Sequence, residues 1–177
     1  MERLADAVGA GNVLTGAGIS ADYTHDEALT ATATVPLAVV RPGETTEVAA
    51  VLRLADEAGV PVTARGSGTG LCGSAIPVAG GLLVSFERMN RILEIDTDNH
   101  VAVVQPGVTL EELNRAVGEH GLVYPVFPGE SSASLGGNVA TNAGGMRAIK
   151  YGVTRHHVLG VEAVLANGDV IRTGGKF

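Results

Sequence analysis

Three glycines at a spacing suited to phosphate binding stand out in the stretch VPVTARGSGTGLCGSA. Gly68, Gly70 and Gly73 formally match the G-x-G-x-x-G fingerprint of dinucleotide-binding loops. Residues without a Cβ let backbone amides come close to an anion, and the hydroxyl groups of Ser67 and Thr69 add donors. The stretch therefore predicts a phosphate-binding loop, which more than one architecture could supply.

Two familiar nucleotide-binding architectures fit the sequence poorly. In a Rossmann unit the glycines open a helix, but Gly73 is followed by SAIPVAGGLLV, where Pro77 lacks an amide donor and Gly80 and Gly81 disfavour a helix. We expect a turn into another strand instead. The motif TGAGISA resembles the NAD-binding opening of sirtuin deacylases, but it lacks the arginine-containing continuation, and the chain's single cysteine cannot build that family's zinc ribbon. We interpret this motif as a turn.

Composition limits the classes of function. The 177 residues suffice for one domain, which could divide into two lobes, and 45% hydrophobic residues with 25 glycines indicate a globular chain rich in turns. A net charge of -7 without basic runs argues against nucleic acid as a partner. The single cysteine, Cys72, excludes an internal disulfide and fits a reducing, cytoplasmic location. We expect no signal peptide and no membrane span, because no long apolar segment is present.

The elements that would position the glycine loop form a small βαβ lobe at about residues 35–90, after an N-terminal helix and arm at residues 1–34. Strands are expected in LAVVRP, VPVTA and GGLLVSF. Apolar residues recur at helical spacing in TTEVAAVLRLADEAG, with Thr45 as the expected N-cap and Gly59 as the C-terminal stop. The loop is therefore expected to connect two strands of this lobe.

Residues from about 91 to 177 are expected to form a larger lobe. Two strands, Ile92–Ile95 and Val101–Gln105, enclose a polar turn and predict a hairpin. VTLEELNRAVGEHG predicts an amphipathic helix that begins with a capping box formed by Thr109 and Glu112.

The last part of the chain mixes irregular sequence with a hairpin. Phe127–Gly152 is too rich in small and turn residues for us to expect regular elements there. VLGVEAVLANGDVIRTGG predicts a hairpin with Asn167 and Gly168 at its turn. His156 and His157 are expected on a strand, where neighbours point to opposite faces, so we expect no metal site.

Three segments in order, RGSGTGLCG, QPGVTLEEL and PGESSASLGGNVATNAGGMRAIKYGVTRHHVLGVEAVLANGDVI, carry a family resemblance. They resemble the FAD-binding domain of the vanillyl-alcohol-oxidase and p-cresol-methylhydroxylase superfamily. The sequence is most similar to the branch with the glycolate oxidase flavoprotein subunit, D-lactate dehydrogenase and D-2-hydroxyglutarate dehydrogenase. The resemblance covers residues 35–177 and implies an α+β, two-lobed FAD-binding domain of the p-cresol-methylhydroxylase type, with a small βαβ lobe and a mixed-sheet lobe. The family continues with a further flavin-binding stretch and a substrate-binding cap, so we expect a C-terminally truncated chain with an incomplete larger lobe.

The resemblance also implies which residues bind FAD. In the pyrophosphate loop these are Arg65, Gly66, Ser67, Gly68, Thr69, Gly70, Leu71, Gly73 and Ser74. Gly107 ends a strand beside the flavin, and Pro128, Gly129, Ser131, Ser132 and Ser134 fall near the adenosine diphosphate and ribityl groups. Gly136, Gly137, Asn138, Thr141, Asn142, Gly144 and Gly145 wrap the cofactor, and the main chain of Val164 meets the adenine. Members with covalent FAD use a histidine where this chain has Thr69, so we expect the FAD to be non-covalent.

The reaction implied by the resemblance is oxidation of a small D-2-hydroxy acid, of the lactate, glycolate or 2-hydroxyglutarate type, with hydride transfer to flavin N5. Relatives take their substrate-binding and active-site residues from a part of the protein beyond Phe177, so we assign no catalytic residue here. The expected partners are the small-molecule substrate in the full-length protein and a second copy of the chain in a homo-oligomer. The alternative is a non-catalytic module that binds FAD or only a protein partner.

Overall fold

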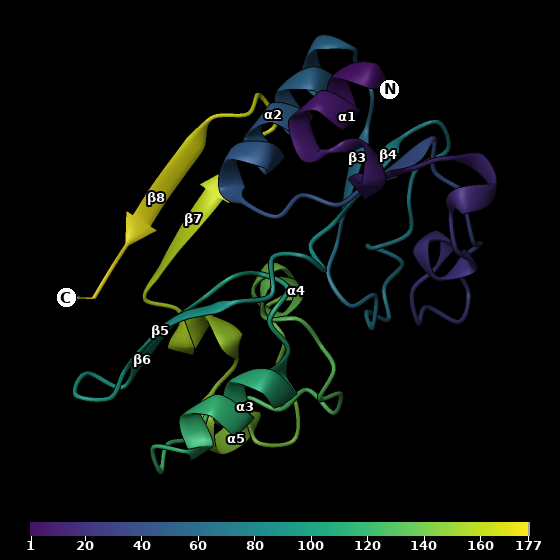
Figure 1. Ribbon diagram of the computed structural model, residues 1–177. Helices are drawn as coiled ribbons and strands as arrows, with labels where there is room; N and C mark the ends of the chain where they lie inside the picture. Colours follow the sequence, from purple (N-terminus) through teal and green to yellow (C-terminus); the bar gives the residue numbers. More distant parts are fainter. Residues whose placement is uncertain (177) are drawn as a thin grey trace.

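A four-stranded sheet and two helices make up the first lobe of the structure, a computed structural model that describes residues 1–176 (Figure 1). The strands are β1 (Val13–Leu14), β2 (Ala38–Val40), β3 (Val62–Arg65) and β4 (Leu82–Ser85), and the helices are α1 (Glu2–Val8) and α2 (Thr45–Glu57). The strand order is β1-β2-β4-β3, in which β2 and β3 run parallel to β4 and β1 runs antiparallel to β2. The predicted βαβ unit is therefore present as β2-α2-β3.

The core of this lobe lies between the sheet and the two helices. Side chains of β2 and β4 alternate, so that Val40 and Val84 pack with Val51 of α2, and Leu4 and Val8 of α1 join the same cluster. The N-terminal 34 residues thus contribute both α1 and the edge strand β1 to the small lobe. The rest of this segment holds three short 3₁₀ turns, at Ala10–Asn12, Gly16–Gly18 and Ala21–Thr24.

No helix or strand occurs between β3 and β4. Pro77 and the following glycines lead the chain through turns into β4, as the sequence predicted, and this excludes a Rossmann unit at the fingerprint. The predicted end of α2 is confirmed, because Gly59 follows the helix with a φ of 63°. The predicted N-cap is wrong. Glu44 is the N-cap, and Thr45 lies inside the first turn, where its hydroxyl donates to Glu162 at 2.5 Å.

The second lobe consists of two hairpins and short helices. Its elements are β5 (Ile92–Asp96), β6 (Val101–Val104), α3 (Leu110–Gly118), α4 (Leu135–Thr141), α5 (Ala148–Tyr151), a 3₁₀ helix η4 (Thr154–His157), β7 (Gly160–Val164) and β8 (Val170–Gly174). The strands pair antiparallel as β5-β6 and β7-β8, so both predicted hairpins are confirmed. Leu110, Leu113 and Val117 of α3 form a second core with Val108 and Leu135.

Two predictions for this lobe are wrong. The expectation of no regular element in Phe127–Gly152 fails because α4 and α5 form there. Two glycines do not prevent α4, since Gly136 lets the helix approach Pro106, whose Cβ would lie 2.6 Å from an added Cβ. His156 and His157 lie in η4, not on a strand.

Within residues 1–176, each helix is too short or too polar to cross a bilayer. In the same residues, no three histidine, cysteine or acidic side chains gather as metal ligands would.

Candidate functional site

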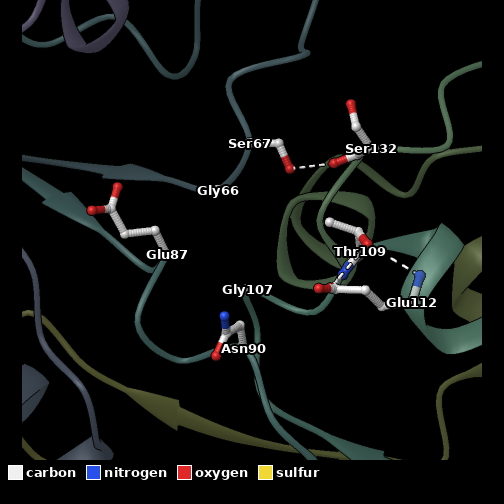
Figure 2. Close-up of a pocket in the computed structure, with 8 residues that line it drawn as sticks. All are labelled: Gly66, Ser67, Glu87, Asn90, Gly107, Thr109, Glu112 and Ser132. Atoms are coloured by element: carbon white, nitrogen blue, oxygen red, sulfur yellow. Dashed lines mark hydrogen bonds between the residues drawn. The ribbon is translucent and has the colours of Figure 1, made fainter.

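A cavity of about 260 Å³ lies among segments from both lobes (Figure 2). It is lined by Gly66 and Ser67 after β3, Glu87 and Asn90 after β4, Gly107, Thr109 and Glu112 around the start of α3, and Ser132 before α4. Gly66, Ser67, Gly107 and Ser132 were predicted as cofactor-binding residues, whereas the other four were not. The fold thus brings together residues from the three segments that resemble the FAD-binding family.

Direct hydrogen bonds join the glycine loop to the serine-rich segment before α4. The Ser67 hydroxyl donates to the carbonyl oxygen of Ser132 at 2.6 Å, and the Ser67 amide donates to the hydroxyl oxygen of Ser134 at 3.3 Å. A Cβ on Gly66 would lie 1.9 Å from that same Ser134 oxygen. Glycine is therefore required at position 66 for the two segments to meet, and this contact fixes one wall of the cavity.

Backbone contacts also fix Gly107 and Gly136. The Gly107 amide donates to Met89 O at 2.8 Å, and a Cβ on Gly107 would lie 2.3 Å from Phe86 O. The Gly136 amide donates to Pro106 O at 2.9 Å. These contacts tie the connection after β4 and the start of α4 to the segment around Gly107.

Glu87, one of the two cavity carboxylates, is held by three donors. Tyr23 donates to it at 2.8 Å, Ser85 at 3.0 Å and Arg41 at 3.2 Å. Burial raises the pKa of Tyr23, and the hydrogen bond to Glu87 adds to this effect. Two of these donors, Tyr23 and Arg41, come from distant parts of the chain, so no local sequence signal could have identified Glu87.

Glu112, the second carboxylate, belongs to the capping box of α3. Its Oε2 accepts from the Thr109 amide at 2.8 Å and from the Thr109 hydroxyl at 2.9 Å, while the Glu112 amide donates to the Thr109 hydroxyl oxygen at 3.2 Å. The sequence predicted this capping box but not that it lines the cavity. Both carboxylates are held by hydrogen bonds from other groups.

The remaining residues of the predicted pyrophosphate loop do not line this cavity. Arg65 is buried, and its guanidinium turns away to donate to His25 O at 2.6 Å. Burial lowers the pKa of Arg65, and the nearby Asp26 carboxylate acts in the opposite direction. The other members, Gly68, Thr69, Gly70, Leu71, Gly73 and Ser74, follow in the irregular connection to β4.

The predicted residues of α4 and its neighbourhood include one buried donor without a partner. Asn138 is 4% exposed, and its Nδ2 has no hydrogen-bond partner among the described residues. By contrast, Thr141 donates to Gly137 O at 2.9 Å, and the Asn142 side chain accepts from the Arg155 amide at 3.0 Å. A buried unpaired amide is costly, so Asn138 is suited to a polar ligand atom.

None of the predicted residues of α4, Asn138 included, lines the cavity, and the remaining predicted positions lie outside its lining as well. These remaining positions are Pro128, Gly129 and Ser131 in the loop before α4, Gly144 and Gly145 after it, and Val164 at the end of β7. Gly145 has a φ of 130°, and a Cβ there would lie 1.9 Å from Phe127 O, so glycine is needed for this close approach.

Comparison with known proteins decides the family. Residues 36–174 match a family model described as an FAD binding domain. The chain belongs to this family. This FAD-binding domain is 59% identical over 175 residues to an uncharacterized FAD-linked oxidoreductase of Mycobacterium tuberculosis, covering 99% of the chain and 38% of that relative.

Further relatives agree with this assignment. The domain is 51% identical to glycolate oxidase subunit GlcD of Bacillus subtilis, over 81% of the chain and 31% of the relative. It is also 51% identical to a D-lactate dehydrogenase of Archaeoglobus fulgidus, over 78% of the chain and 31% of the relative. A crystal structure of p-cresol methylhydroxylase superposes with a TM-score of 0.82 at 31% identity, over 98% of the chain and 34% of that protein. The α+β, p-cresol-methylhydroxylase-type fold is thus confirmed, and the chain spans about a third of the length of these relatives.

The residues of the site fit FAD. Glycines 66 and 107 bring backbone close to the cavity, and Asn138 offers a buried unpaired donor. When bound, FAD supplies the hydride acceptor that amino-acid side chains lack. The domain's own residues can hold and orient the cofactor.

Proposed function

We propose that this chain is the FAD-binding part of an oxidoreductase that oxidises a small D-2-hydroxy acid by hydride transfer to flavin N5. The observation that carries the proposal is the convergence of Ser67, Gly107 and Ser132 on one cavity, within a chain that belongs to the FAD binding domain family. Relatives include glycolate oxidase subunits, D-lactate dehydrogenases and a D-2-hydroxyglutarate dehydrogenase, which supports a substrate of this class.

In this proposal the protein's residues bind and orient the cofactor. Backbone amides of the glycine loop donate to the pyrophosphate, and the hydrogen bonds of Ser67 keep the loop against the segment before α4. Asn138 Nδ2 donates to a polar group of the cofactor. The FAD is non-covalent, because Thr69 has no nucleophilic nitrogen. We assign no catalytic residue.

The location, assembly and domain limits are also proposals. A cytoplasmic location is supported by the free, exposed Cys72. For the domain limits we keep an N-terminal segment at residues 1–34 and an FAD-binding domain from residue 35; the family match to residues 36–174 supports this division, whereas the packing of α1 and β1 joins the N-terminal segment to the first lobe. Homo-oligomerisation is a further proposal, supported by exposed apolar side chains on the hairpins.

The second candidate function is a non-catalytic module that binds FAD or a protein partner. The observation that favours it for the chain alone is that both cavity carboxylates, Glu87 and Glu112, accept hydrogen bonds from neighbouring groups that hold the structure together.

The test is a titration of the purified chain with FAD, followed by flavin fluorescence, with riboflavin as the comparison. We expect FAD to bind more tightly than riboflavin because the loop contacts the pyrophosphate. Asn138→Leu should weaken FAD binding by about tenfold through loss of its donor. Asn99→Leu, in the exposed turn of the β5-β6 hairpin, is the control and should bind as the parent does. A parent chain that binds neither flavin would overturn the proposal.

A further inference from the structure

A short segment of the N-terminal arm, residues 25–28, contacts the glycine loop at its beginning, middle and end. Arg65 donates to His25 O at 2.6 Å, and the Glu27 amide donates to Gly70 O at 2.9 Å. The Ala75 amide donates to Asp26 Oδ2 at 3.4 Å. We call residues 25–28 the N-terminal clamp. Figure 1 shows this purple segment on the same side of the molecule as the loop between β3 and β4.

Asp26 is the buried centre of the clamp. Only 5% of the residue is exposed, although it carries a carboxylate. Its Oδ1 accepts from the Ala28 amide at 3.0 Å, which shapes the clamp itself, while its Oδ2 faces the loop. A Cβ on Gly70 would lie 3.7 Å from Oδ2, so the carboxylate lies beside the middle of the loop.

Arg65 is a second buried charged residue that packs against the loop. It is 8% exposed, and its guanidinium lies directly behind Gly68, where an added Cβ would be 2.1 Å from Nη2. Burial lowers the pKa of Arg65, and among the nearby groups Asp26 opposes that shift most. The Asp26 carboxylate and the Arg65 guanidinium thus lie against the same loop, and Arg65 is joined to the clamp by its hydrogen bond to His25 O.

We propose that Asp26 is a positioning residue that holds the glycine loop in the conformation required for the pyrophosphate of FAD, without contacting the cofactor. A loop with several glycines has many accessible conformations, and anchoring it beforehand lowers the entropy lost on binding. The inference rests on the proposed function for its ligand, whereas the clamp itself can be tested in the absence of FAD.

The experiment uses the 177-residue chain with three substitutions. Asp26→Ala removes both acceptor oxygens, and Asp26→Asn keeps an acceptor but removes the charge. Glu27→Gln is the matched control, because it removes a neighbouring exposed charge whose side chain makes no hydrogen bond within residues 1–176. Each variant is titrated with FAD and with riboflavin, and amide hydrogen exchange is followed without flavin. Melting temperatures show whether each variant is folded.

We expect Asp26→Ala to weaken FAD binding by about tenfold or more and to leave riboflavin binding unchanged, since riboflavin has no phosphate. Asp26→Asn should restore part of the affinity, and Glu27→Gln should match the parent. Exchange in residues 66–75 should rise in Asp26→Ala and stay unchanged in α3.

The outcomes separate the two proposals. Equal FAD affinity in Asp26→Ala and the parent overturns the positioning role, whatever the exchange shows. An equal loss of FAD and riboflavin binding also overturns it, because the effect is then general. If the parent chain binds no flavin but loop exchange is faster in Asp26→Ala than in the parent, the clamp is supported and the proposed function is rejected. Unchanged loop exchange in Asp26→Ala rejects the clamp.

Discussion

The structure requires glycine at position 68 of the loop much more strongly than at position 70. Gly68 has a φ of 75°, and an added Cβ would collide with the Arg65 guanidinium. Gly70 has no such backbone restriction, and its Cβ would meet only Asp26 and Ser74 at ordinary contact distances of 3.7 and 3.9 Å. The structural requirement for glycine is therefore strong at position 68 and weak at position 70.

We expect Gly68→Ala to lower the free energy of unfolding by about 1–2 kcal/mol, because alanine is strained at this φ. Gly70→Ala should change it by less than about 0.5 kcal/mol. Urea denaturation of both variants, with the parent beside them, measures the difference. Equal stabilities would show that the loop relaxes around position 68.

At position 69, the side chain decides how a flavin would be attached. Threonine has no nucleophilic nitrogen, so any bound FAD should be released when the protein is precipitated with acid. The absorbance of the supernatant and the pellet measures this. Flavin that stays in the washed pellet would contradict the prediction.

Helices and strands were predicted correctly where the residues that stabilise them lie within one short segment of the sequence. The capping box of Thr109 and Glu112 marked the start of α3, and it is present. The helix α4 was missed because LGGNVAT has poor intrinsic helix propensity, and its contact with Pro106 depends on tertiary structure. Dependence on tertiary structure also explains which residues of the cavity were predicted. Gly66 and Ser67 were found from their own motif, whereas Glu87 is a site residue only because distant segments bring donors to it.

The capping box offers an element-scale prediction. Thr109→Ala should cost about 1 kcal/mol of stability, because it removes the hydroxyl that accepts from the Glu112 amide. Thr45→Ala is the control, since Thr45 lies at the start of α2 without being its N-cap and its hydroxyl bonds the exposed Glu162 side chain, not the backbone of the helix. We expect the control to cost less than about 0.5 kcal/mol in thermal or urea unfolding. A larger loss from Thr45 than from Thr109 would contradict the assignment of the caps.

The association state of the whole molecule depends on the second lobe, which has two separate two-stranded hairpins. An isolated two-stranded hairpin is only marginally stable in water without further strands. Exposed apolar side chains on the two hairpins include Leu93, Val103, Val170 and Ile171. We expect the 177-residue chain to associate with itself as its concentration rises. Light scattering coupled to gel filtration measures this, and Ile171→Lys should reduce it. A monomer at all concentrations would contradict the prediction.

The chain spans only about a third of the length of its relatives, and the consequence for activity can be tested. Flavin-dependent oxidation needs a closed site that holds the substrate carbon against the flavin, and such positioning can account for about 7–11 kcal/mol of the barrier. In the described residues the cavity carboxylates Glu87 and Glu112 accept hydrogen bonds from donors that hold them in place, and neither has been shown to face a substrate carbon. We therefore expect no reduction of a dye acceptor by this chain with D-lactate, glycolate or D-2-hydroxyglutarate, even with FAD added. The full-length B. subtilis relative serves as the positive control under the same conditions. Clear activity from the 177-residue chain would place a catalytic group within it, and His156, His157 and Lys150, which lie close together in sequence after α4, would be the first side chains to replace.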